Sequence, residues 1–190
     1  MFTQLAARRV ADWLIQGGNA AEEREVYEFG LEKLFSTLTN FAFVLCFGFL
    51  FGTPLQSLVF YVAYSMLRVY AGGYHAEKPL ICFFISIGAM IPFLLLIRFQ
   101  QIWNVPIVFY GLLVLGVAIL VTLGPVEHKN KPLDDLAKVV YRRRMLRNLM
   151  MATVGATGLA ALSLDNYAVA VLCGVLLSAA TAGAGKVKLG

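Results

Sequence analysis

Charged residues are scarce in this chain of 190 residues, because Asp, Glu, Lys and Arg together make up only 14% of it. Soluble domains carry about 25% charged residues and about 45–50% apolar residues. Here 59% of the residues are hydrophobic. The shortage of charge excludes an ordinary soluble domain and indicates a chain that lies largely within a lipid bilayer.

Cysteine is also scarce, and its pattern excludes several kinds of site. The three cysteines, Cys46, Cys82 and Cys173, are odd in number and widely spaced, so no disulfide framework is expected. The tandem-cysteine and His-Glu-x-x-His patterns of zinc sites are absent. The glycine-rich phosphate loop and the Gly-x-Ser-x-Gly turn of serine hydrolases are absent too. We therefore expect no metal and no cofactor.

Long apolar runs, in contrast, recur through most of the chain, and each can cross about 30 Å of hydrocarbon. Because a helix satisfies its own backbone hydrogen bonds in lipid, each run is predicted to be a spanning helix. The sequence thus predicts an all-α membrane protein: one polytopic domain over residues 1–190, containing a bundle of six transmembrane helices. The approximate spans are 34–51, 54–71, 80–97, 102–124, 147–164 and 166–184.

The last predicted span contains small residues at a regular spacing. Gly174, Ser178 and Ala182 follow one another at intervals of four residues, so they lie on one face of a helix. Small residues allow two helix backbones to approach closely in lipid. We therefore predict that this face packs against another helix of the bundle.

The first residues of the chain have a different pattern from the spans. Residues 1–17 lack the uninterrupted apolar core of a signal peptide, because Arg8, Arg9 and Asp12 interrupt it. Their apolar side chains fall on one helical face, and Gly17 and Gly18 follow as a helix end. This pattern predicts an amphipathic helix that lies in the membrane interface. A structural helix packed under the bundle is the alternative.

The positive residues are distributed unevenly among the segments between the predicted spans. All of the 16 Lys and Arg residues except Arg98 fall on one side of a six-span arrangement. Because cytoplasmic segments carry the excess of Lys and Arg, both termini and the segment between the second and third spans are predicted to be cytoplasmic.

The net charge of +5 follows from this bias and does not indicate nucleic-acid binding, since the basic residues flank apolar runs. The most basic run is YRRRMLRN, Tyr141–Asn148. It is predicted to contact anionic lipid headgroups, with an acidic peptide as the alternative partner.

One polar stretch, RVYAGGYHAEKPLICFF at Arg68–Phe84, lies between two apolar runs. Cys82 begins the second of these runs, seven residues after His75, whereas Cys46 and Cys173 lie in the middle of apolar runs and are expected to be small buried hydrophobes. A Cys–His pair can form a thiolate–imidazolium pair that is nucleophilic near neutral pH. The residues alone leave open a helix-packing cysteine and an interfacial histidine bonded to a backbone carbonyl.

The spacing of the pair constrains the backbone between its members. In one continuous helix the Cα atoms of His75 and Cys82 would lie about 10 Å apart along the axis, at about 1.5 Å per residue. Gly72 and Gly73 permit unusual backbone angles, and Pro79 disfavours helix at the residue before it. We therefore predict a bent connector that brings the imidazole towards the thiol.

Neighbouring polar residues admit several roles. Arg68 either extends to the membrane interface or binds a substrate carboxylate or a developing oxyanion. Glu77 is a candidate to orient His75, and a metal site formed by these two residues with Cys82 and His128 lacks the usual ligand spacing. Two other function classes remain: a small-peptide or ion transporter with His75 and Glu77 as relay groups, and a non-catalytic sensor with a structural Cys82.

Two motifs together resemble those of a known family. The first is RVYAGGYHA at residues 68–76, with Cys82 seven residues after the histidine. The second is GPVEHKNKPL at residues 124–133, after the fourth predicted span. The length, the amphipathic start and the six-run layout also agree. Over nearly its whole length the chain resembles the AgrB family, accessory gene regulator protein B.

AgrB-like proteins are membrane-embedded cysteine endopeptidases of bacterial quorum sensing. They cut a small AgrD-type precursor of an autoinducing peptide and help to close the retained segment into a thiolactone or lactone ring. The resemblance implies a homodimer in the bacterial cytoplasmic membrane, with membrane lipids and the precursor as partners and the catalytic site facing the cytoplasm. It implies an acyl-thioester on Cys82 as nucleophile, with His75 as base. The expected supporting or substrate-binding residues are Arg68, Gly73, Glu77, Lys129, Asn130 and Lys131.

Overall fold

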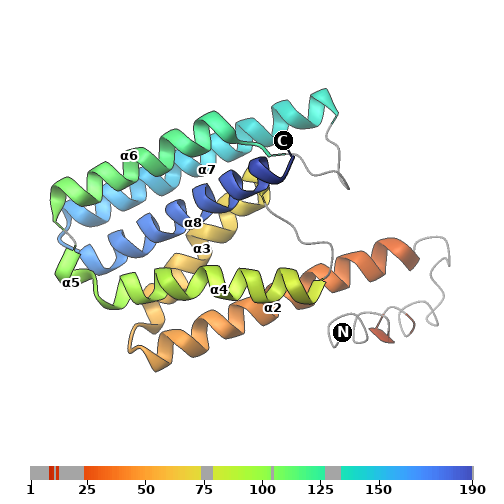
Figure 1. Cartoon of the computed structure of the whole chain (residues 1–190), viewed down its shortest axis with the longest axis horizontal. Helices are drawn as coiled ribbons and strands as arrows, with labels where there is room; N and C mark the ends of the chain where they lie inside the picture. The colour runs from red at the N-terminus through yellow and green to blue at the C-terminus, as the bar shows by residue number, and fades with distance from the viewer. Residues whose placement is uncertain are drawn as a thin grey trace. The chain divides into compact units, whose positions relative to one another are not determined.

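The structure, a computed structural model, describes residues 9, 10, 12, 24–73, 79–103, 105–126 and 134–189 (Figure 1). Among these residues there is no β-strand, so the all-α prediction is confirmed for them. Most of the predicted interfacial helix at 1–17 lies outside the described residues. The main helices are α2 (Arg24–Leu50), α3 (Pro54–Ala71), α4 (Pro79–Arg98), α5 (Gln100–Trp103), α6 (Pro106–Leu123), α7 (Asp135–Ala161) and α8 (Asp165–Leu189).

Each predicted span coincides at least in part with a helix, but one of the six is interrupted. The predicted run 102–124 is divided, because α5 ends at Trp103 and α6 begins at Pro106. Proline favours the first turn of a helix, where its missing N–H is not needed, and it disfavours helix at the residue before it. Among the described residues, two helices are long and apolar enough to cross a membrane: Pro106–Leu123 and Asp165–Val187.

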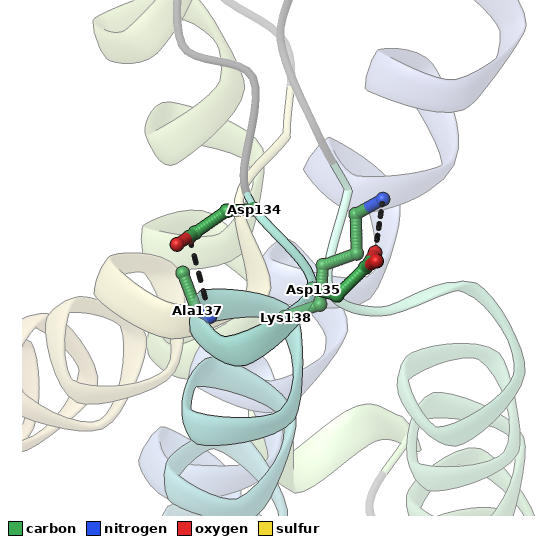
Figure 2. Close-up of polar contacts among 4 residues, drawn as sticks. All are labelled: Asp134, Asp135, Ala137 and Lys138. Carbon is green, nitrogen blue, oxygen red and sulfur yellow. Dashed lines mark hydrogen bonds and ion pairs between the residues drawn. The ribbon is translucent and has the colours of Figure 1, made fainter.

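The helix α7 begins well before the predicted run 147–164. Its N-cap residue is Asp134, whose carboxylate accepts a hydrogen bond of 3.3 Å from the backbone nitrogen of Ala137 (Figure 2). Lys138 Nζ lies 3.6 Å from the carboxylate of Asp135 in the same turn (Figure 2). An Asp N-cap satisfies one of the free N–H groups at a helix start. Because α7 continues from Asp135 to Ala161, the basic run Tyr141–Asn148 lies on the same helix as the apolar run that follows it.

The described helices belong to two compact units, each considered by itself. The first unit comprises residues 1–43 and 76–87, and the second comprises 44–75 and 88–190. In the first unit, Phe43 of α2 meets Phe83 of α4 edge to face, with ring centroids 5.5 Å apart. In the second unit, α8 runs alongside α3, α6 and α7 (Figure 1).

The contact between α8 and α3 confirms the predicted face of small residues. A Cβ atom on Gly174 would lie 2.8 Å from the Cβ atom of Ala63 and 2.9 Å from the backbone nitrogen of Tyr64. Ser178 Oγ donates to the Gly174 carbonyl at 2.8 Å and lies 3.5 Å from the Tyr64 carbonyl oxygen. Ala182 is fully buried. The two backbones approach this closely only because the side chains between them are small.

A buried cluster connects the four helices near the ends of α3 and α6. It consists of apolar residues from α3, α6, α7 and α8 together with Val126, which follows α6. Its members are Leu67, Ala71, Leu120, Val126, Met145, Leu149, Val175, Ala179 and Ala182. The first sequence motif begins in the last turn of α3, and the second begins directly after α6. The cluster therefore packs where both motifs begin.

The prediction that the two mid-run cysteines are buried is right for one and wrong for the other. Cys173 is fully buried in α8, whereas Cys46 is exposed on α2. Among the α2 residues whose burial the structure describes, Val44 and Gly48 are the buried ones, and they lie four residues apart on one face. Cys46 lies midway between them in sequence and therefore on the opposite face of the helix.

Candidate functional site

The connector between α3 and α4 starts with two glycines in conformations that other residues rarely adopt. Gly72 follows Ala71, the last residue of α3, with φ +69°, and Gly73 has φ +134°. Glycine alone reaches such values without steric cost. The predicted unusual backbone angles are thus confirmed. The predicted approach of His75 to Cys82 lies outside the described residues.

Arg68 lies one turn before the glycines and contacts both of them. Its Nη1 atom donates a hydrogen bond to the Gly72 carbonyl oxygen. A Cβ atom on Gly73 would overlap the Arg68 guanidinium group and would lie 2.7 Å from the Thr181 carbonyl oxygen of α8. Gly73 is therefore confined between a cation and a helix backbone, and any side chain there would displace one of them.

The two sequence motifs meet through their backbones. The Val126 nitrogen donates to the Ala71 carbonyl oxygen at 2.9 Å, and an isolated parallel bridge pairs Gly72 with Val126. A Cβ atom on Gly72 would overlap the Val126 carbonyl oxygen. We call this pairing of residues 71–73 with residues 124–126 the junction. It explains why a glycine is needed at the start of the connector, whatever the chemistry nearby.

The second half of the junction is held by α7. Arg142 Nη1 donates to the Gly124 carbonyl oxygen at 3.2 Å, and its Nη2 lies 3.4 Å from the Val121 carbonyl oxygen. A Cβ atom on Gly124 would overlap the sulfur atom of Met145, which is fully buried. The peptide bond between Gly124 and Pro125 is cis.

Aromatic and polar side chains connect α7 with the end of α3. The rings of Tyr70 and Tyr141 meet edge to face at 5.8 Å, and the Arg144 guanidinium lies 5.8 Å from the Tyr70 ring centroid. The buried Asn148 donates from Nδ2 to the Met66 carbonyl oxygen at 2.8 Å. Part of the basic run therefore contacts other helices of the same chain. The composition of the run did not predict these contacts. A lone Asn at the edge of an apolar run was the available signal, because a polar group there needs a partner.

The predicted site residues fall into three groups. Arg68 and Gly73 are in contact in the second unit. Cys82 lies in the first turn of α4, in the first unit. The remaining candidates lie outside the described residues: His75, Glu77, Lys129, Asn130 and Lys131. The structure thus brings together two candidate residues of the first motif, Arg68 and Gly73, and joins their segment to the start of the second motif.

Comparison with known proteins gives a consistent result. The family model of accessory gene regulator B matches residues 7–182. AgrB-like protein 2 of Clostridium perfringens strain 13 is 34% identical over 122 residues, which cover 62% of this chain and 57% of that protein. An AgrB-like protein of Listeria innocua is 28% identical over 161 residues, which cover 82% of this chain and 76% of that protein. No solved structure matches the chain.

The match to the family includes both halves of the junction and Cys82. The chain spans little more than half the length of the clostridial relative that it matches. Family membership and two helices that can cross a bilayer together indicate a membrane protein. On the family match over residues 7–182, the chain belongs to the AgrB family of accessory gene regulator proteins.

Proposed function

We propose that this chain is a membrane-embedded cysteine endopeptidase of bacterial quorum sensing. It cuts an AgrD-type precursor and promotes closure of the retained peptide into a thiolactone or lactone ring. The observation that carries the proposal is the junction. It joins the two motifs of the family resemblance by backbone pairing at Gly72 and Val126, directly before the segment that contains His75.

In the proposed reaction, His75 accepts the proton of the Cys82 thiol, and the thiolate attacks a peptide carbonyl of the precursor. The C-terminal fragment leaves as an amine that takes its proton from His75, and an acyl-thioester remains on Cys82. A cysteine or serine side chain of the retained peptide then attacks the thioester. The ring closes on that side chain, and the Cys82 thiol is released.

Cyclisation requires that the side chain of the retained peptide attack the thioester faster than water hydrolyses it. A site recessed at the membrane edge supplies the exclusion of water, and a retained peptide held beside the thioester supplies proximity. In this proposal six helices span the cytoplasmic membrane, both termini and the connector face the cytoplasm, and the protein acts as a homodimer. Membrane binding by enzyme and precursor raises their local concentration.

The other candidate site residues have supporting roles in this proposal. The contact of Arg68 with the Gly72 carbonyl supports a role in fixing the connector that contains His75. Gly73 allows the close approach of Arg68 and α8, and Glu77 orients His75. Three residues of the second motif contact the acidic C-terminal part of the precursor: Lys129, Asn130 and Lys131.

Replacement of the nucleophile tests the proposal directly. We expect Cys82→Ala to abolish precursor cleavage, to below about 10⁻³ of the wild-type rate, while the protein still inserts into the membrane. The measurement is cleavage of a synthetic AgrD-type precursor by protein in phospholipid vesicles, followed by mass spectrometry.

The other two cysteines provide matched controls for this experiment. Cys46→Ala and Cys173→Ala remove an exposed and a buried thiol from helices other than α4. Both variants should cleave the precursor at nearly the wild-type rate. The proposal is wrong if Cys82→Ala still cleaves, or if either control loses cleavage as completely as Cys82→Ala does.

A further inference from the structure

The four arginines of the basic run are not equivalent. Arg142 donates to carbonyl oxygens of Val121 and Gly124, as described above. Arg143, next to it, is exposed and makes no hydrogen bond or ion pair with any residue that the structure describes. The two neighbours have equal charge and similar exposure, so the difference between them lies in contacts alone.

The end of α6 has a specific need for a donor. In a continuing helix, the Val121 carbonyl would accept a hydrogen bond from the nitrogen of residue 125. That residue is Pro125, which has no N–H group. The last carbonyls of a helix must then find other donors, and a cation there also interacts favourably with the helix dipole. The Arg142 guanidinium supplies both the donor and the charge.

Arg142 acts together with Met145, which lies three residues later on the same face of α7. Met145 packs against the Cα atom of Gly124, while Arg142 binds the Gly124 carbonyl. Two residues after Gly124, Val126 pairs with Ala71 and Gly72. A continuous set of contacts therefore leads from the Arg142 guanidinium to the connector.

We propose that Arg142 is a positioning residue that fixes residues 124–126 and, through the junction, the connector at Gly72 and Gly73. Its effect on cleavage rests on the proposed function, because the connector leads to His75. Arg142 acts through backbone groups and does not bind the precursor. Its loss should therefore lower kcat, whereas loss of a cation that attracts an acidic peptide should raise KM in a salt-dependent manner.

The first test measures the junction without any enzymatic assay. Hydrogen–deuterium exchange of the protein in lipid nanodiscs reports protection of the Val126 amide, which is hydrogen-bonded to Ala71. Arg142→Ala should speed exchange of peptides that contain Val126 by about fivefold or more, since two carbonyl oxygens lose their donor. The matched control Arg143→Ala, with the same loss of charge, should exchange like the wild type.

The second test measures cleavage by the full-length chain in vesicles. Arg142→Ala should lower kcat by about tenfold with KM changed less than about twofold, and the loss should persist in 0.5 M salt. Arg142→Lys should restore part of kcat, because one ammonium group reaches fewer carbonyls than a planar guanidinium. Arg143→Ala should retain the wild-type kcat.

The outcomes separate this proposal from the proposed function. Equal exchange of the Val126 amide in Arg142→Ala and Arg143→Ala overturns the positioning role. It is also overturned if KM rises equally in these two variants and the rise disappears at high salt. If the wild type itself fails to cleave, the proposed function fails, and the exchange result still decides whether Arg142 fixes the junction. If Arg142→Ala does not accumulate in the membrane, Arg142→Gln replaces it and should show faster exchange than Arg143→Gln.

Discussion

The helices α6 and α8 are both long and apolar enough to cross a bilayer, yet they differ in how far the rest of the chain covers them. The more apolar of the two, α6, is mostly exposed, with Ile107 and Val114 exposed by 83% and 67%. The less apolar helix, α8, is mostly buried among α3, α6 and α7.

This difference follows from the size of the side chains and not from their polarity. In lipid, apolar side chains gain little by leaving one hydrocarbon surface for another, so helices associate where close van der Waals contact is possible. Gly174, Ser178 and Ala182 provide that contact on α8. The large exposed side chains of α6 are suited to a face against lipid chains.

A charge on the exposed face of α6 should have the largest effect. Val114 lies near the middle of that helix, so Val114→Lys should make the free energy of membrane insertion less favourable by about 2.5–3.5 kcal/mol. The measurement is the fraction of protein that remains membrane-integrated after alkaline extraction. The control is Val139→Lys, at a similarly exposed position in the first half of α7, outside the predicted spans. Equal integration of the two variants would show that this face of α6 does not contact lipid.

A second substitution tests close packing on α8. Gly174→Leu should destabilise the protein by about 2–3 kcal/mol, because its side chain would meet the backbone of Tyr64 and the Phe60 carbonyl at 3.0 Å. Gly111→Leu on α6 is the matched control, since nothing lies within 4 Å of a Cβ atom there. Thermal unfolding in detergent should separate the two variants clearly. Similar midpoints would mean that α8 is not held against α3 in this way.

The smallest effect concerns two hydroxyl groups with the same local bond. Ser178 and Thr122 each donate to the carbonyl four residues earlier, at 2.8 Å, but Ser178 is buried and Thr122 is exposed. Ser178→Ala should cost about 0.6 kcal/mol through the lost contact to α3, and Thr122→Ala should be neutral. Thermal unfolding in detergent without chemical denaturant, or steric-trap unfolding, can resolve the difference in stability between the two variants. A larger loss for Thr122→Ala would contradict the assigned burial.

Much of the helix content could be predicted from hydropathy, because each apolar run is long enough to favour a helix over a short strand. Hydropathy does not indicate where α7 begins, since residues 135–146 are helical without being apolar. There the relevant signal was local: Asp134 as an N-cap before a run of good helix formers. The start of α6 also has a local signal, Pro106, which lies inside the apolar run 102–124.

The site could be predicted only in its local features. Two adjacent glycines predicted unusual backbone angles at residues 72 and 73, and both have positive φ. The pairing of Gly72 with Val126 was not predictable, because nothing in either segment identifies its partner. Pro125 indicates from sequence that Val121 lacks a helical donor, but only the packing of α7 identifies Arg142 as its replacement.

The contact of Gly73 with Thr181 also has a consequence for biosynthesis. A chain emerging from the ribosome contains Gly73 long before it contains α8, and domains assemble in the order in which their parts become available. The connector cannot reach its final packing until α8 has been synthesised. A half-made protein would therefore lack one side of the packing around Gly73, so the order of translation delays completion of the connector until the end of the chain has been made.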